Sequence, residues 1–297
     1  MNRRQIARII TAVATSDGAG VKLKRSLGQS PGARLDPLLM LDEFYSDRPE
    51  DYLGGFPSHP HRGFETVTYM LAGNMLHRDH MDNRGELGPG DLQWMTAGRG
   101  VIHSEMPQQR DGLLRGFQLW INLPAKEKWR AAEYRDIAAE QIPELRRPGL
   151  RLRHLAGRLQ LPSEQSQSTG YINGTDGRQL STDPLYADLQ LAAGRELTLQ
   201  FDAGHNACVY VYNGQLSIGG RAVQAGEAAL LDRGDYLQLS SETGADALLL
   251  AGRPIGEAIV QYGPFVMNSA DEIEQALRDY RNGQLTDSGK PAVNDSH

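Results

Sequence analysis

Residues 56–73 read FPSHPHRGFETVTYMLAG, and this stretch combines two closely spaced histidines with the pattern of a β-strand. Its second half, Glu65–Leu71, mixes apolar and alternating positions and ends in a glycine turn, as half-buried strands do. Similar stretches between glycine turns recur from residue 6 to about residue 123 and from about residue 185 to residue 262. The sequence therefore predicts an all-β fold of many short antiparallel strands.

The composition sets the size and the class of the protein. The chain has 297 residues, of which 39% are hydrophobic and 33 are glycine. At roughly 150 residues per domain, this length suggests two domains or one large all-β domain. No apolar run approaches the ~20 residues of a membrane-spanning helix, so we expect no membrane protein. A formal net charge of −6 argues against direct nucleic-acid binding.

The cysteine content and the first residues bear on the compartment. Cys208 is the single cysteine and lies in an apolar stretch, which favours a buried, inert thiol and excludes an intrachain disulfide. The first residues are basic, as in a secretory signal. However, Arg8 interrupts the apolar run, and the remaining Ile9–Ala14 is too short for a signal sequence. We therefore expect a cytoplasmic protein.

The two strand-rich blocks resemble each other. Each contains a strand, a glycine turn, a second strand and then a turn of a small residue, glycine and an acid; the glycines are Gly73 and Gly90 in the first block and Gly214 and Gly226 in the second. This repeat suggests a duplicated β-domain. The charged segment 124–148 between the blocks is interpreted as a linker with one or two helical turns.

We place the two domains at residues 1–138 and 139–297. Within the second, the Ser/Gly/Asn-rich segment 162–177 predicts a surface loop. A helix is predicted after Ser269, which can cap it, and before Gly283, which can end it. Its apolar face would consist of Ile273, Ala276, Leu277 and Tyr280.

Two residue pairs carry the candidate chemistry. They are His59 and His61 in the first strand block, and His103 and Glu105 further along. Residues two apart on a strand project to the same face, so each pair offers two ligands to one side. Pro60 cannot donate a ladder hydrogen bond, which places the first pair at a strand start or edge. If the two strands face each other inside a barrel, three imidazoles and one carboxylate gather around a point.

Such a donor set suits a divalent first-row metal, and Fe, Mn, Ni, Cu and Zn are all compatible with it. A six-coordinate ion would keep about two open positions for water, O2 or a chelating substrate. One carboxylate leaves the site formally cationic, which favours an anionic enolate or phenolate. Two alternatives stay open: the histidines are ordinary core or surface residues, or the metal is only a structural staple.

By the alternation of side chains along a strand, Glu65 would project to the same face as His59 and His61. It could be a further ligand, or an acceptor that orients an imidazole, and we favour the second. His77 and His80 are expected in solvent, near the end of a strand. Three further histidines have no partner at ligand spacing in the sequence: His154, His205 and His297.

The chain resembles the pirin family of the cupin superfamily over nearly its whole length. The resemblance is carried by residues 56–69, 89–107 and 262–268, the last reading YGPFVMN. It implies two stacked antiparallel β-barrel (jelly-roll) cupin domains in one chain, a bicupin, with one metal in the N-terminal domain. It also implies that this metal is iron, as Fe(II), held by the residues that match the family's ligands: His59, His61, His103 and Glu105. The wider cupin pattern would instead use the Glu65 position.

The resemblance also allows the second block to be aligned on the first. Without gaps, Gln200 and Asp202 fall at the positions of His59 and His61. By the same procedure, Leu239 and Ser241 fall at the positions of His103 and Glu105. We therefore expect the C-terminal domain to lack metal ligands and to be structural.

The resemblance implies a metal-dependent dioxygenase that acts with O2 on a flavonol-like aromatic substrate such as quercetin. Glu105 could accept the hydroxyl proton of that substrate as it binds, in addition to holding the metal. The alternative is a metal- or redox-sensing protein that regulates a transcription factor or a metabolic enzyme through protein–protein contact.

Overall fold

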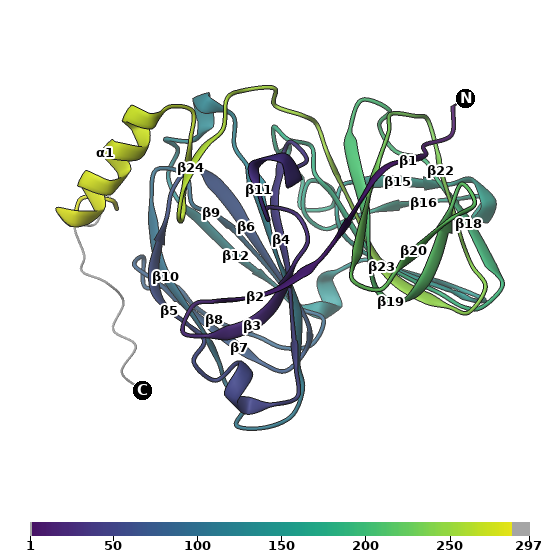
Figure 1. The fold of residues 1–297 in the computed structure, drawn as a ribbon, viewed down its shortest axis with the longest axis horizontal. Helices are drawn as coiled ribbons and strands as arrows, with labels where there is room; N and C mark the ends of the chain where they lie inside the picture. Colours follow the sequence, from purple (N-terminus) through teal and green to yellow (C-terminus); the bar gives the residue numbers. More distant parts are fainter. Residues whose placement is uncertain (1, 287–297) are drawn as a thin grey trace. The chain divides into compact units, whose positions relative to one another are not determined.

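The computed structural model describes residues 2–286 and shows the predicted all-β fold, with one α-helix among the described residues (Figure 1). The chain forms two compact units, each built from several segments. The N-terminal unit comprises residues 14–25, 39–139 and the segment from 255 onward, and the C-terminal unit comprises the first 13 residues and residues 26–38 and 140–254.

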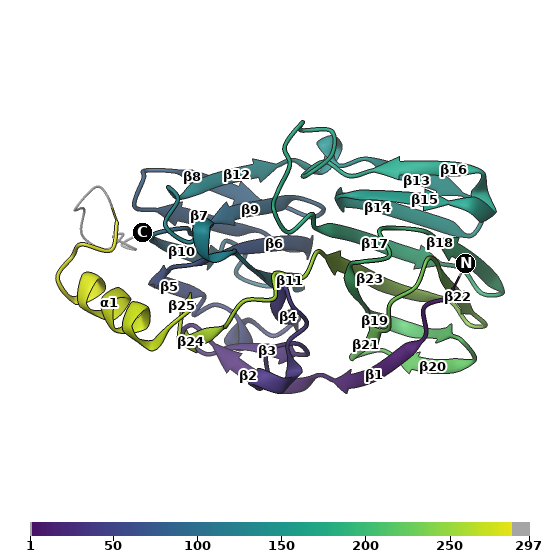
Figure 2. The ribbon, with the colours of Figure 1, turned by 90° about the horizontal axis from the view of Figure 1, so that it is seen from above.

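The N-terminal unit contains two antiparallel sheets. One has the strand order β12-β9-β6-β11-β4-β3-β2, and the other has the order β5-β10-β7-β8 (Figure 2). Its strands are β2 (Val13–Asp17), β3 (Val21–Arg25), β4 (Leu38–Ser46), β5 (Phe56–His61), β6 (Phe64–Ala72), β7 (Met75–Asp79), β8 (Arg84–Leu87), β9 (Leu92–Thr96), β10 (Val101–Pro107), β11 (Leu114–Asn122) and β12 (Glu133–Ile137). Side chains of the two sheets meet, because Thr68 on β6 hydrogen-bonds to Glu105 on β10.

The C-terminal unit repeats this architecture around an apolar core. Its strands are β1 (Ile6–Thr11), β13 (Glu144–Arg147), β14 (Leu150–Ala156), β15 (Arg158–Leu161), β16 (Ser166–Thr169), β17 (Leu185–Leu191), β18 (Arg195–Leu199), β19 (Asn206–Ile218), β20 (Arg221–Gln224), β21 (Glu227–Leu231), β22 (Leu237–Ser241) and β23 (Ala245–Gly252). The core consists mainly of fully buried leucine, valine and alanine side chains. Burying such side chains is the main favourable contribution to folding.

The same strand pairings occur twice. In the N-terminal unit β6 lies between β9 and β11, and β7 lies between β8 and β10. In the C-terminal unit the first part of the long strand β19 pairs with β21 and β23, and its last part pairs with β20 and β22. The bend between the two parts falls at a glycine with positive φ in both units, Gly73 (+80°) and Gly214 (+68°). Glycine adopts this conformation without the strain of a Cβ. By this scheme β18 and β22 correspond to β5 and β10.

Each unit also contains a segment from the far end of the sequence. Strand β1 pairs with β21 in the C-terminal unit. The hairpin β24 (Val260–Tyr262) and β25 (Phe265–Met267) and helix α1 (Ala270–Arg281) belong to the N-terminal unit. The division at residues 138 and 139 stays a prediction about the two cupin domains, and each compact unit includes segments from both sides of it.

The predicted helix is confirmed at both ends. Ser269 and Glu272 form a reciprocal capping box, in which each side chain accepts from the other residue's backbone N–H. Gly283 follows the helix with φ +68°, as a terminating glycine does. Buried Ile273 and Ala276 face the unit.

Two segments were expected to contain less strand than they do. The linker 124–148 has the expected single turns, at Ala125–Glu127 and Ala139–Gln141, but it also forms β12 and β13. The segment 162–177 forms β16 as well as a short turn at Pro162–Glu164. Both sequences are polar, yet their backbones complete sheet edges, which hydropathy does not reveal. No helix in the described residues is long and apolar enough to cross a membrane.

Candidate metal centre

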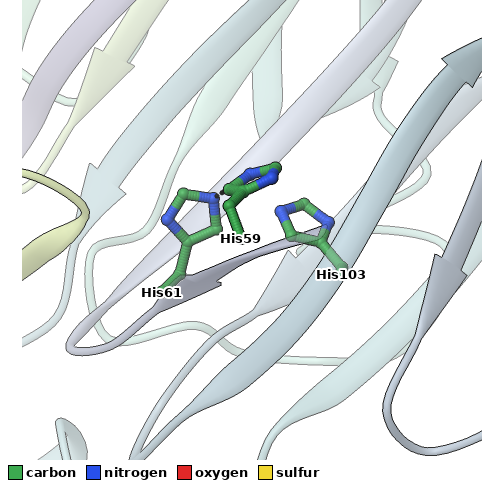
Figure 3. Close-up of side chains that lie close together, drawn as sticks. All are labelled: His59, His61 and His103. Carbon is green, nitrogen blue, oxygen red and sulfur yellow. Dashed lines mark hydrogen bonds between the residues drawn. The ribbon is translucent and has the colours of Figure 1, made fainter. Parts of the chain in front are cut away.

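Three of the predicted ligands come together on two neighbouring strands. The register of β5 and β10 pairs His103 directly with His59, and His61 lies two residues along β5. One ligand atom from each of the three histidines lies within 4.8 Å of the other two (Figure 3). The rings converge, with centroid separations of 4.7 Å for His59–His61, 4.3 Å for His59–His103 and 4.9 Å for His61–His103.

The first two imidazoles are oriented as a pair of metal ligands. His59 Nδ1 is 2.8 Å from the carbonyl oxygen of Pro57, to which it must donate, so its Nε2 carries a lone pair. That Nε2 lies 3.0 Å from His61 Nε2. For metal–nitrogen bonds of about 2.1 Å, two ligands at right angles lie about 3.0 Å apart. The observed separation therefore fits two ligands of one ion.

Burial keeps the imidazoles of His61 and His103 neutral. His103 is 0% exposed and His61 is 3% exposed. Burial lowers the pKa of both well below the usual value, and the neighbouring His59 lowers it further. Neutral imidazole is the form that binds metal. His103 Nε2 is also buried without a hydrogen-bond partner among residues 2–286, so a metal would satisfy an orphaned atom.

Glu105 lies nearby but outside this group of atoms. It is buried, and its Oε1 accepts a hydrogen bond of 3.0 Å from Thr68 Oγ1, which is also 2.7 Å from Gln118 Oε1. Burial raises the pKa of the Glu105 carboxyl to about 7. Its place as the fourth ligand stays a prediction, and the structure shows a buried carboxyl that can hold a proton near neutral pH.

Glu65 is also outside the group. It lies on β6, and its Oε1 accepts a hydrogen bond of 2.7 Å from Thr96 Oγ1 on β9. Burial raises the pKa of this carboxyl. The hydrogen bond that positions Glu65 therefore comes from a threonine of its own sheet, and its role toward the metal stays a prediction.

The expectation that His77 and His80 are solvated is wrong, because they are 0% and 6% exposed. His77 lies on β7, which pairs with β10 on one side and β8 on the other, so its side chain reaches the unit interior. Its Nδ1 is 3.4 Å from His103 Nδ1. A single histidine on a strand carries no spacing signal, so only the register of β7 against β10 reveals this contact.

An aromatic surface adjoins His61. Its ring lies 5.3 Å from that of Trp120 and 5.1 Å from that of Phe64, and these two rings lie 4.3 Å apart. Trp120 is only partly buried. Neither residue stands out in the sequence, although Phe64 follows the ligand motif by three residues.

The C-terminal segment holds the chain on either side of the ligands. Arg62, next to His61, is 2% exposed and donates to Asp279 Oδ2 at 2.6 Å and to the carbonyl of Leu285 at 3.3 Å. It also donates to the carbonyl of Arg99, just before β10. A Cβ on Gly100 would lie 2.1 Å from the Leu285 carbonyl oxygen, so a side chain at this position would exclude the segment.

A buried lysine adds a second attachment. Lys128 is 0% exposed, and its Nζ donates to the carbonyls of Gly63 and Val266 at 2.7 and 3.0 Å and to Asn122 Oδ1 at 2.7 Å. Burial lowers the pKa of this lysine to about 8. Neither Arg62 nor Lys128 could be recognised as an attachment from the sequence, since their partners are distant along the chain.

The corresponding strands of the C-terminal unit carry leucines. Strand β18 ends at Leu199, so Gln200 and Asp202 lie beyond it rather than at ligand positions, and the gapless alignment is corrected there. The longer turn between β18 and β19 accounts for the shift. The buried residues of β18, β22 and the end of β19 belong to the apolar core; they are Leu197, Leu199, Leu237, Leu239, Leu216 and Ile218. The expectation that this domain lacks metal ligands stays a prediction.

A second group of donor atoms occurs in loops of the C-terminal unit, where ligand atoms of Asp183, Asp202 and His205 lie within 4.8 Å of one another. His205 Nε2 is 3.2 Å from Asp183 Oδ2. Asp183 Oδ1 accepts a hydrogen bond from Asn173 Nδ2 at 2.7 Å. Asp183 thus has protein partners in both contacts, and the sequence spacing of His205 did not indicate this group.

Comparison with known proteins matches both halves of the chain. Residues 20–121 match the family model for Pirin, and residues 186–286 match the model for the Pirin C-terminal cupin domain. A Pseudomonas aeruginosa protein named "Putative quercetin 2,3-dioxygenase" is 51% identical over 286 residues, or 95% of this chain and 98% of that protein. Human pirin is 37% identical over 276 residues, or 91% of this chain and 89% of human pirin. A crystal structure of quercetin 2,3-dioxygenase from Acinetobacter baumannii has a TM-score of 0.84 and 31% identity, covering 95% of this chain and 98% of that one.

Proposed function

The chain belongs to the pirin family, and from this premise we propose that it is an iron-dependent dioxygenase that acts on a flavonol-like enol or phenol such as quercetin. The observation that carries the proposal is the convergence of three imidazoles, of which His61 and His103 are buried and neutral, beside a buried carboxyl whose pKa is raised to about 7. The similarity to proteins named quercetin 2,3-dioxygenase supports the choice of reaction.

His59, His61, His103 and Glu105 would hold the metal. When bound, Fe(II) supplies an electrophilic centre with open positions at which a chelating phenolate and O2 can be brought together. The protein's own contribution is to keep His61 and His103 neutral by burial and to fix the ring directions through strand register and the bond from His59 to the Pro57 carbonyl.

Glu105 would receive the proton of the substrate hydroxyl. Burial raises the pKa of this carboxyl to about 7 in the metal-free protein, which makes Glu105 a stronger base than an exposed glutamate and suits it to accept a proton and later return it. Thr68 keeps the carboxyl in place from the opposite sheet. The same residue would thus serve as ligand and base.

The aromatic surface beside His61 would orient the substrate. Flat aromatic molecules pack favourably against the faces or edges of other rings at centroid separations of about 4.5–7 Å. Trp120 is partly exposed and is supported from behind by Phe64. A flavonol that chelates the metal would then have its ring system against Trp120.

The test is turnover by protein loaded with iron under anaerobic conditions and then exposed to O2 with quercetin. Wild type is expected to consume quercetin, His61→Ala to retain no more than about 1% of that rate, and Glu105→Gln to be slowed about 100-fold or more. His205→Ala, in the C-terminal unit, serves as the matched control and should behave as wild type. Equal consumption by wild type and His61→Ala would contradict the proposal.

A loaded wild type that consumes no flavonol would also contradict it. That result would favour the regulatory alternative, which predicts a stoichiometric protein partner that is captured by the iron-loaded chain and lost on chelation. Elemental analysis of the same samples verifies that each variant was compared at known metal content.

A further inference from the structure

We propose that His77 is a positioning residue of the metal centre, which holds His103 in the one tautomer that can bind metal. The inference rests on the proposed metal centre but not on its substrate. It concerns the side of His103 that faces away from His59 and His61.

The two rings meet inside the sheet. His77 on β7 and His103 on β10 lie on paired strands, and their Nδ1 atoms are 3.4 Å apart. The ring centroids are 5.0 Å apart and the ring planes are inclined by 50°. Both residues are 0% exposed, so water cannot readily replace the contact.

The contact couples the two tautomers. A neutral imidazole has one N–H and one lone pair, so two facing Nδ1 atoms are compatible only if one donates to the other. If His103 Nδ1 donates, its Nε2 keeps a lone pair for the metal. If instead His77 Nδ1 donates, His103 carries its proton on Nε2 and cannot bind through that atom. Therefore only the arrangement in which His103 Nδ1 donates to His77 leaves His103 Nε2 able to bind a metal.

The surroundings of His77 hold its ring in place. The ring of Tyr134 covers it, with centroids 4.6 Å apart and planes inclined by 31°. Tyr134 donates its hydroxyl to Asp136 Oδ2 at 2.5 Å, and Gln93 Nε2 donates to Asp136 Oδ1 at 3.1 Å. A Cβ on Gly85 would lie 1.7 Å from Asp136 Oδ2, so glycine there leaves room for this arrangement.

The other unit supports a link between His77 and the ligands. Where β7 carries His77, the corresponding part of β19 carries Leu216 and Ile218, both buried in the apolar core. The imidazole behind the ligands is therefore absent from the described C-terminal unit, whose corresponding strands also carry leucines in place of the ligands. If His77 had only a structural role, its presence would not be expected to coincide with the presence of the proposed ligands.

The test measures metal affinity and tautomer, not turnover. Zn(II) affinity is determined by competition with a chelator for wild type, His77→Leu and His77→Asn, since asparagine keeps an acceptor near the Nδ1 position. His77→Leu should weaken binding about 10- to 100-fold, as loss of an outer partner typically does, and His77→Asn should remain within about threefold of wild type. His154→Leu removes an equally buried histidine of the C-terminal unit and should leave the affinity unchanged.

Nitrogen-15 NMR of the histidine rings gives a second readout that a merely structural role would not change. In zinc-loaded wild type and His77→Asn, His103 should carry its proton on Nδ1 and the metal on Nε2. Wild-type affinity in a folded His77→Leu, or metal on Nδ1 of His103, would overturn the inference. Absence of quercetin turnover would affect neither readout, so the failure of the substrate proposal is distinguishable from the failure of this one.

Discussion

The two units build the same strand pairings around opposite kinds of interior. In the N-terminal unit, β5, β7 and β10 turn imidazoles toward the inside, whereas in the C-terminal unit β18, β19 and β22 turn leucine and isoleucine there. The apolar version packs without help, because close-packed hydrocarbon stabilises the fold by itself. The imidazole version leaves buried nitrogen atoms to be satisfied by something else. The same strand pairings are therefore compatible with either interior, and the imidazoles are an addition that the strand geometry tolerates.

Both units are also held together by buried basic side chains that bond to distant segments. Arg62 and Lys128 tie the ligand strands of the N-terminal unit to the C-terminal segment. In the C-terminal unit the buried Arg4 makes a similar attachment, since it donates to the backbone carbonyls of Asp202, His205 and Asp232. Each unit is thus held at a loop by a buried arginine, and in the N-terminal unit that arginine lies next to the proposed ligand His61.

The largest expected effect comes from breaking the attachment at Arg62. Arg62→Leu leaves the Asp279 carboxylate, 16% exposed, without its partner, and we expect a loss of about 3–5 kcal/mol from the unfolding free energy of the N-terminal unit. Tryptophan fluorescence measures this unit alone, because Trp94, Trp120 and Trp129 all lie in it.

The matched control is Arg4→Leu, followed through Cys208, whose buried thiol becomes reactive when the C-terminal unit opens. Burial raises the pKa of this thiol to about 12, so the native protein should resist alkylation. Arg4→Leu should speed Cys208 labelling without moving the fluorescence transition of the N-terminal unit. An Arg62→Leu protein as stable as wild type would show that the C-terminal segment is not needed to hold the ligand strands.

A reciprocal exchange tests whether the imidazoles cost stability. In metal-free protein, His61→Leu should raise the unfolding free energy of the N-terminal unit by about 1–3 kcal/mol, because it removes the buried Nδ1, which has no hydrogen-bond partner among residues 2–286. Added metal should then no longer stabilise this unit. Denaturant titrations read by tryptophan fluorescence, with and without Zn(II), measure both effects.

Leu199→His is the reverse exchange in the C-terminal unit and should destabilise it, since it buries an imidazole in the apolar core. If His61→Leu destabilised the metal-free protein instead, the imidazole cluster would have to be a stabilising network in its own right.

The smallest effect concerns acid. Burial lowers the pKa of His77 and of His154 to about 3, so below pH 6.5 the unfolded chain binds protons that the folded chain does not. Stability is therefore lost as the pH falls from about 6.5 toward 3, and each of these histidines should contribute a loss of about 1 kcal/mol at pH 5.5.

The two units should differ in this response. In the N-terminal unit His61 and His103 act in the same direction as His77, and Glu105, with a pKa raised to about 7, acts in the opposite direction and offsets about one of these three histidines. In the C-terminal unit His154 is the corresponding histidine. Between pH 7 and pH 5.5, fluorescence of the metal-free protein should therefore report a larger loss than Cys208 labelling. Equal losses in the two units would contradict this expected difference.

Strand alternation was sufficient to predict the histidine trio and the strands that carry it. His59 and His61 lie at a spacing that a strand turns to one face, and the cap at Ser269 identified the helix. His103 was expected on a strand facing theirs inside a barrel, but it joins them because β10 pairs directly with β5. The position of β18 was not predictable in the same way, because the turn after it is longer than the turn after β5. An alignment without gaps therefore moved Gln200 and Asp202 to positions that leucines occupy.

Contacts between distant segments account for the other differences. His77 has no partner at ligand spacing in the sequence, and its contact with His103 depends on the register of β7 against β10. The bond from Arg62 to Asp279 joins residues 217 positions apart. Local patterns predict which face a side chain occupies, but they do not predict what lies opposite it.

The placement of β24, β25 and α1 in the N-terminal unit has a consequence for synthesis. His59, His61 and His103 leave the ribosome early, but Asp279 and Leu285 follow after most of the C-terminal unit has been made. At about 5–20 residues per second, the ~150 residues between 139 and 285 take about 7–30 s. During that interval the ligand strands lack the segment that secures them. The proposed metal centre is therefore fully secured only in a finished chain, and prematurely ended products should retain a bound metal poorly.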